Sequence, residues 1–279
     1  MGTQRSSDGP GGGVPLIPSW VQPVTVPTEP VVVQPGESDG DITPDQGQIP
    51  VAPILAPPSR FKAARRRLGK FSNSGSRQDL KSGLGHYVRT GLGGAVQGAR
   101  RMGGTASVAG KLYGGLEGFR AGEARPAELG LDKAALSGKP AREVGDRIID
   151  SVCPVDGSQD TEARRDSLSR SISELAEQFP NLDLTALTPE QIDLLLERFV
   201  AFDLCHRIEL DVGKAIFLKA ANPAIAVKRI EEMRQYVREK ISAFFRAKGK
   251  EGQGLTRSAA AVLTAGVIQD TLAVFEGYV

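Results

Sequence analysis

The chain has 279 residues and a net charge of only +2, with 33 glycines and 18 prolines. Two cysteines, Cys153 and Cys205, are too few for a disulfide framework and are typical of a reducing cytosol. Prolines interrupt the first apolar residues, and no uninterrupted apolar run reaches membrane-spanning length, so we expect a soluble, cytoplasmic protein without a signal peptide or membrane contact.

Residues 1–58 have the composition of an arm that cannot build a core. Gly, Pro, Ser and Asp dominate, and prolines cut the short apolar pieces, which predicts a disordered N-terminal arm. Leu16, Pro18 and Trp20 are interpreted as a docking peptide, because the only tryptophan of the chain supplies a large aromatic anchor. Five acidic residues between Glu29 and Asp45 either lie over the basic stretch that follows or are simply solvated.

The extreme N-terminus favours removal of the initiator methionine. Gly2 is small, so its processing leaves a free glycine amine at the end of the arm. Gly2 with Ser6 also matches the short myristoylation pattern, although a glycine-rich context makes that match nonspecific. From these residues alone, an ordinary processed terminus is the simpler interpretation.

Residues 59–125 are predicted to be a basic, glycine-rich helical segment. Between Arg60 and Gly122 the basic residues are opposed only by Asp79 and Glu117. A charge distribution this one-sided needs an anionic partner, either on this chain or on another molecule. The candidate partner-binding residues are Arg65, Arg66, Arg89, Arg100 and Arg101.

The same segment carries small residues at a spacing of four, namely Ala106, Gly110, Gly114, Gly118 and Gly122. On a helix this spacing forms a seam that another backbone can approach closely. Each glycine inside a helix costs about 0.8–1 kcal/mol relative to alanine, so such a helix needs packing to persist. An apolar stripe favours a helix over residues 106–120, whereas the paired glycines in 91–94 and 103–104 fit helix and loop equally well.

Residues 126–279 are predicted to form an α-helical domain. Helices are expected over 132–136, from Pro140, over 160–179, from Thr188, from Pro223 to about 249, and from Thr256 to about 275. Thr188 and Gln191 form a capping box with proline at the first helical position. Alternation of period two is nowhere sustained, so the predicted fold class is all-α. The predicted buried stripe of the longest helix is Val227, Ile230, Met233, Val237, Ile241 and Phe244.

The residue pattern predicts no catalytic site, no metal site and no cofactor. Adjacent Cys205 and His206 diverge by about 100° on a helix and make a poor nucleophile–base pair. Cys153 follows a helix and is more simply a buried structural thiol. Zinc-ligand spacings are absent, and the Gly110-Lys111 pair lacks the preceding glycine and following Ser/Thr of a phosphate loop.

Several of these stretches together resemble one family, the Qat anti-phage system associated protein, B component. The resemblance covers nearly the whole chain and departs from the family around residues 204–214. The residues that carry it are Met1-Gly2-Thr3, Gly9-Pro10, Pro15–Pro18, Trp20, Arg60-Phe61, Ala64–Arg66, Phe71, Tyr87–Gly91, Gly93-Gly94, Ala99–Met102, Cys153-Pro154, Asp156-Gly157 and Asp160, with weaker similarity at Leu204-Cys205 and Lys214–Ile216.

This resemblance implies a bacterial defence operon that also encodes an ATPase, a QueC-like enzyme and a TatD-like nuclease. QueC-like enzymes activate a deazapurine carboxylate with ATP and join it to an amine, and the Gly2 amine is a suitable acceptor. The leading hypothesis is therefore a non-catalytic complex subunit that is modified at Gly2 by its QueC-like partner. A nucleic-acid-binding protein that uses residues 60–101 is the alternative, and a hydrolase based on Cys153 or Cys205 is the least favoured interpretation.

Overall fold

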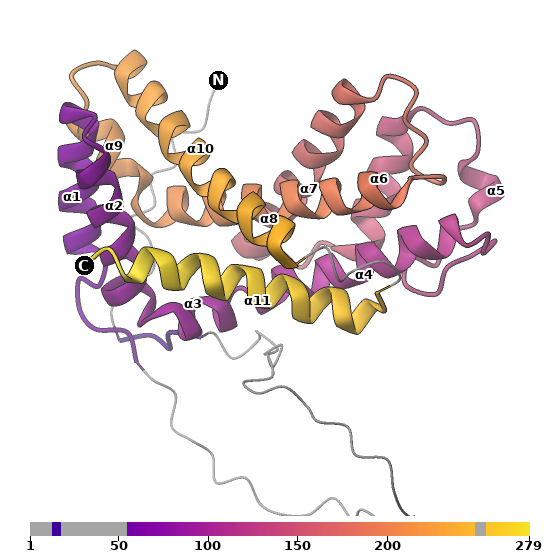
Figure 1. Ribbon diagram of the computed structural model, residues 1–279, viewed down its shortest axis with the longest axis horizontal. Coiled ribbons are helices and arrows are strands. Elements are labelled where there is room, and N and C mark those ends of the chain that lie inside the picture. The colour runs from indigo at the N-terminus through magenta and orange to yellow at the C-terminus, as the bar shows by residue number, and fades with distance from the viewer. Residues whose placement is uncertain (1–12, 18–54, 249–254) are drawn as a thin grey trace, which may run out of the picture.

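The computed structural model describes residues 13–17, 55–248 and 255–279. Over these residues every regular element is helical apart from one isolated β-bridge, so the prediction of an all-α fold is confirmed (Figure 1). The helices are α1 (Lys62–Ser74), α2 (Arg77–His86), the π-helix η1 (Tyr87–Leu92), α3 (Ala95–Arg101), α4 (Gly103–Arg120), α5 (Lys133–Leu136), α6 (Ala141–Val152), α7 (Gln159–Gln178), α8 (Pro189–Ile208), the π-helix η2 (Glu209–Gly213), α9 (Lys214–Lys219), α10 (Pro223–Lys248) and α11 (Arg257–Glu276).

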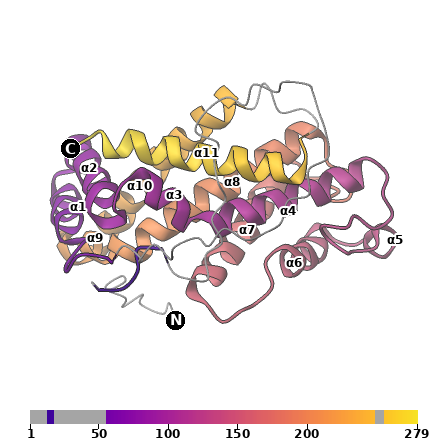
Figure 2. The same cartoon turned by 90° about the horizontal axis from the view of Figure 1, so that it is seen from below.

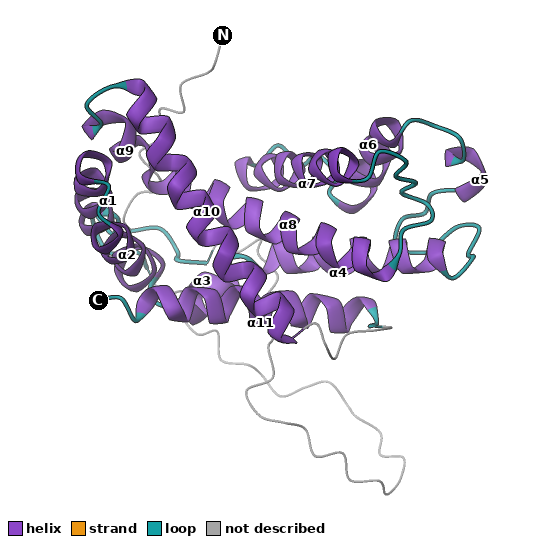
Figure 3. Cartoon of the chain, turned by 45° about the horizontal axis from the view of Figure 1, so that its top comes forward, coloured by secondary structure: helices purple, strands orange, loops and turns teal. Residues whose placement is uncertain are grey.

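The described helices form an elongated body. α1, α2 and α9 gather at one end, and α5 and α6 lie at the other (Figures 1 and 2). α10 runs obliquely across α8 and also contacts α11 (Figure 3). One hydrophobic core runs from Phe61 and Leu68 at the first helix to Phe275 in the last. The predicted regions 59–125 and 126–279 therefore share a core.

The small-residue seam of α4 lies against α11 and the loop that follows α4. A Cβ atom added to Gly110 would lie 2.7 Å from the carbonyl oxygen of Arg257, and one on Gly118 would lie 2.8 Å from Pro126 Cβ. No side chain fits at these distances, so glycine is what allows the close approach. The packing that the glycine-rich helix needed is thus supplied within the chain.

Local signals place the helix starts well. Thr188 Oγ1 accepts from the Gln191 backbone N–H at 3.3 Å, and the Gln191 side chain accepts from the Thr188 N–H at 2.9 Å. The predicted capping box is therefore confirmed. Thr256 caps α11 in the same way, through the backbone N–H of Ala259.

The two glycine pairs behave differently. Gly93 and Gly94 have φ values of +79° and +99° and separate η1 from α3, because these left-handed conformations suit glycine. Gly103 and Gly104 instead open α4 directly after a break at Met102.

The apolar stripe of α10 needs two corrections. Val227 is 60 % exposed, whereas its neighbour Ala226 is fully buried, so the buried face at the start of α10 runs through Ala226 and Ile230 and Val227 lies beside it. At the other end Phe245 is buried, whereas Phe244 is only half-buried.

α11 has the length and apolar composition of a membrane span, with a mean hydropathy of 1.5. Its apolar run is interrupted by Gln269 and Asp270, so α11 does not contradict the expectation that no uninterrupted apolar run has membrane-spanning length. Half of that window is buried, and α11 contacts α4, α3 and α10. Within the described residues these are the contacts of a core helix.

Candidate functional site

A buried tyrosine–carboxylate pair joins the first part of the chain to the last. Tyr87 is the first residue of η1, and Asp211 lies in η2. The Tyr87 hydroxyl donates to Asp211 Oδ2 at 3.0 Å, and the Tyr87 ring stacks on Phe61 with centroids 5.6 Å apart. Burial raises the pKa of both Tyr87 and Asp211. Each residue is placed by a π-helical turn, a feature that is frequent at functional sites.

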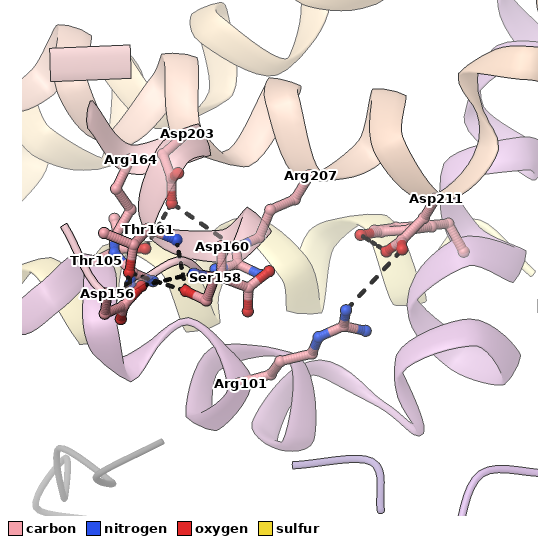
Figure 4. A network of polar contacts seen from close by, with 11 residues as sticks. Arg101, Thr105, Asp156, Ser158, Asp160, Thr161, Arg164, Asp203, Arg207 and Asp211 are labelled. Carbon is pink, nitrogen blue, oxygen red and sulfur yellow. Dashed lines mark hydrogen bonds and ion pairs between the residues drawn. The ribbon is translucent and has the colours of Figure 1, made fainter. Parts of the chain in front are cut away.

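Arginines surround this pair. Arg65 donates through Nε and Nη2 to the Asp211 carbonyl oxygen, at 3.3 and 3.0 Å. Arg101 Nη2 lies 3.9 Å from Asp211 Oδ1, and Figure 4 shows its guanidinium directed at that carboxylate. Arg60 is 4 % exposed, and its guanidinium lies 4.8 Å from the centre of the Phe61 ring. We call Arg60, Arg65, Tyr87, Arg101 and Asp211 the arginine centre.

A polar network extends from this centre along α8. Arg207 Nη1 lies 3.0 Å from Asp160 Oδ1, and its Nε lies 3.8 Å from Asp203 Oδ2 (Figure 4). The hydroxyl of Thr105, in α4, donates to Asp203 at 2.5 Å. The network thereby ties α4 and α7 to α8 through charges that are buried or nearly so.

The loop before α7 ends the network at the surface. Asp156 Oδ1 accepts from the Ser158 backbone N–H at 2.8 Å, and its Oδ2 accepts from the Thr161 hydroxyl at 2.8 Å. These hydrogen bonds stabilise the charged carboxylate and lower the pKa of Asp156 to about 2. The pKa of Asp156 is therefore lowered, whereas the pKa of Asp211 in the arginine centre is raised.

The N-terminal arm meets the body at a short anchor. The Gly13 N–H donates to the Ala56 carbonyl at 2.7 Å, and the Ala56 N–H donates back to Val14 at 2.8 Å. Leu16 is 6 % exposed and packs beside Gly93, where an added Cβ would lie 2.7 Å from Leu16 Cδ1. The burial of Leu16 and the backbone hydrogen bonds to Ala56 hold residues 13–17 against the body. The prediction of a disordered arm over residues 1–58 therefore does not apply to this short piece.

The predicted site residues do not form one surface. Leu16 docks on its own chain, while Pro18, Trp20 and the proposed modification site Gly2 lie outside the described residues. Arg65 and Arg101 turn inward to Asp211, so for them the anionic partner is on this chain. Arg89 is exposed and donates to the Val279 carbonyl at 2.8 Å. Arg66 and Arg100 are exposed on α1 and α3.

Sequence reasoning missed the acidic side of this arrangement. Asp203, Arg207 and Asp211 lie on a helix whose last turns are buried all round, so no polar face marks them as a site. The available signal was a charged residue flanked by apolar ones, as in Leu210-Asp211-Val212. A charge in such a setting is buried and needs a partner.

Neither cysteine has the environment of a nucleophile. Both are buried, and burial raises the pKa of each thiol. Over the described residues, no group of three or more His, Cys, Asp or Glu side chains is placed to hold a metal ion.

The chain was compared with family models, curated proteins and solved structures. The family model described as Qat anti-phage system associated protein QatB matches residues 93–275, more than half of the chain. That range contains Arg100, Arg101, Asp203 and Asp211, while the arm and α1 precede it. No curated protein and no solved structure matches the chain.

Proposed function

Because the chain belongs to the family of the Qat anti-phage system associated protein QatB, we propose that it is a non-catalytic subunit that presents its N-terminus to a QueC-like partner enzyme. Family membership makes the chain a component of an anti-phage system. The proposed partners are the QueC-like enzyme, an ATPase and a TatD-like nuclease, assembled in the cytoplasm.

The anchor at Leu16 is the observation that carries this proposal. It holds Leu16, and with it the residues next to it in the arm, beside Gly93 on the body. Whatever path the preceding residues take, the chain from Gly2 to Gly13 spans at most ~40 Å when fully extended. An enzyme bound within that distance of Gly93 can therefore receive the N-terminal amine while the body stays folded.

The proposed reaction is acylation of the Gly2 amine. The partner activates a deazapurine carboxylate with ATP, which releases pyrophosphate and leaves an acyl adenylate. The uncharged amine attacks the carbonyl carbon, an amide bond forms, AMP leaves and the nitrogen loses a proton. A terminal amine has a reference pKa near ~8, so a useful fraction is uncharged at neutral pH. Glycine also offers no side chain to obstruct the approach.

Mass spectrometry of the N-terminal peptide tests this function. We expect an adduct on Gly2 in chain purified from the complete operon, and none when the QueC-like enzyme is deleted. Gly2→Pro should abolish both adduct and defence, whereas Gly9→Pro is the matched control within the arm. Leu16→Ala should lower the yield of adduct without changing the melting temperature of the body. An unmodified Gly2 in a fully active system would rule the reaction out.

A nucleic-acid-binding role is the second candidate, and one observation favours it. Lys62, Arg66 and Lys70 recur every fourth residue on α1 and are all exposed. Charge reversal at Arg66 and Arg100 spares the buried arginines and tests this surface. Binding of DNA or RNA that falls steeply with salt and is lost on reversal would promote this candidate over protein binding.

A further inference from the structure

The arginine centre and its extension contain more hydrogen-bond donors than acceptors. Six buried guanidinium nitrogens, Nε and Nη1 of Arg60 and Arg101 together with Nε and Nη2 of Arg207, have no hydrogen-bond partner among the described residues. Only one carboxylate oxygen in the same region, Asp203 Oδ1, is left without a donor. Buried polar groups are normally paired, and an unpaired buried charge is strongly unfavourable.

The buried charges are also unbalanced, with more positive than negative groups. Arg207 faces two carboxylates, Asp160 and Asp203. In the arginine centre Asp211 supplies the single carboxylate: Arg101 is ion-paired with it, Arg65 binds its backbone carbonyl, and Arg60 feels its charge. Arg65 uses only the Asp211 carbonyl oxygen, and Arg101 lies 3.9 Å from the carboxylate. The pKa of Arg60 is lowered by burial and by the nearby Arg101, as expected for two cations held close together. Within the arginine centre three arginines face one carboxylate, an excess of two positive charges, and adding Arg207 with Asp160 and Asp203 still leaves an excess of one. Ordered water satisfies donors, but it does not neutralise this charge.

We propose that Arg60, Arg65 and Arg101 bind a phosphate dianion at the arginine centre. A guanidinium matches phosphate oxygens with paired N–H groups, and a dianion offsets the two unmatched charges. Arg60, at 4 % exposure, forms the inner wall of the site. The side chain of Arg101, at 12 % exposure, and the half-buried Arg65 form its outer side.

This site is separate from the proposed modification of Gly2. It is built entirely from body residues and requires neither the arm nor the QueC-like partner. Failure of either proposal leaves the other standing.

Thermal unfolding of the full chain tests the site. Potassium phosphate replaces potassium chloride at constant ionic strength, so that screening stays the same. Phosphate at one hundred times its Kd should raise the Tm by roughly 5–10 °C. Isothermal titration should give one phosphate per chain. No rise in Tm over the chloride control would overturn the proposal.

Matched variants locate the effect. Arg60→Gln and Arg101→Gln should abolish the phosphate-dependent rise, while Arg100→Gln, one residue away and exposed, should keep it. In chloride Arg60→Gln should melt close to the parent, because it removes an unsatisfied buried cation. If either glutamine variant fails to fold, Arg101→Lys is the substitute. It retains the positive charge without the paired N–H groups of a guanidinium, so phosphate should raise its Tm less than that of the parent. An equal rise in the parent and in Arg101→Gln or Arg101→Lys would overturn the proposal.

Different ligands then identify the source of the phosphate. The probes are inorganic phosphate, a nucleoside 5′-monophosphate, and an oligonucleotide with either a 5′-phosphate or a 5′-hydroxyl. The probe with the lowest Kd, if its binding is lost in Arg101→Gln, identifies the source. Equal binding of both oligonucleotides that survives Arg101→Gln, with no response to the two small probes, would place phosphate recognition elsewhere and refute the site.

Discussion

The α4–α11 seam and the arginine centre both join an early part of the chain to a late part. The seam does so by close steric packing, and the arginine centre does so by pairing buried charges. At the seam, glycine removes side-chain volume so that Gly110 lies against the Arg257 carbonyl. At the centre, a buried carboxylate gathers arginines from α1 and α3. The first contact depends on shape and is insensitive to pH and ions. The second depends on charge, so solution conditions and ligands act on it.

The largest expected effect comes from removing the charge at the centre. Asp211→Asn keeps the shape of the side chain but leaves the buried arginines without their carboxylate. Because burial raises the pKa of Asp211, losing its charge also relieves a desolvation penalty, so the free energy of unfolding should fall by about 3 kcal/mol, the lower end of the cost of breaking a buried ion pair. Urea denaturation in chloride buffer measures it. Asp146→Asn, at an exposed site on α6, is the control and should change stability by less than about 0.5 kcal/mol. Equal stabilities of the two variants would show that Asp211 does not neutralise the centre.

The seam should respond to volume alone. Gly110→Ala places a methyl group against a backbone oxygen and should cost about 1–2 kcal/mol, even though alanine favours the helix. Gly266→Ala, on α11, is the matched control. A Cβ there would meet only the end of the flexible Lys248 side chain, at 3.1 Å, whose ammonium is ion-paired with Asp270 at the surface and can shift, so this variant should gain up to about 1 kcal/mol. Parallel urea titrations at pH 6 and 8 should give the same difference, and a marked pH dependence would contradict a purely steric seam.

The smallest effect separates the two carboxyl groups of the polar network by pH. The pKa of Asp156 is lowered to about 2, so its stabilising hydrogen bonds persist above pH ~4 and are lost as pH falls toward 2. Asp156→Asn should therefore flatten part of the acid limb of a Tm-versus-pH curve. The pKa of Asp211 is raised, so protonating it favours the folded state, and its contribution to stability declines as pH rises through its folded pKa. A parallel acid limb in Asp156→Asn and the parent would contradict the role of Asp156.

Local chemistry accounts for the part of the fold that the sequence could predict. Helix starts are encoded within a few residues, as at Thr188 and Thr256, and the seam is visible as a spacing of four. Of the predicted arginines, Arg65 and Arg101 contact Asp211, so for these two the expected anionic partner lies on this chain. Their role as partner-binding residues stays a prediction, as it does for the exposed Arg66, Arg89 and Arg100.

The remainder of the site depends on pairings between distant residues. Tyr87 and Asp211 are separated by 124 positions, and nothing near either one in the sequence specifies the other. Leu16 likewise docks on a backbone position, Gly93, that offers no side chain to recognise. The pattern of a single sequence does not predict such contacts, because periodicity indicates which face of a helix is buried but not which other element packs against that face.

The π-helical turn at η2 has a consequence for how this family can tolerate changes in length. α8, η2 and α9 follow one another without a break, and a π turn holds one residue more than the hydrogen-bonding pattern of an α-helix. Deleting one residue between Ile208 and Lys214 would convert the π turn into an α turn, which keeps α9 in register but moves Asp211 off the position that faces Tyr87. A one-residue deletion here is therefore expected to do more harm than most substitutions, and relatives that lack the extra residue are expected to have lost the buried acid with it.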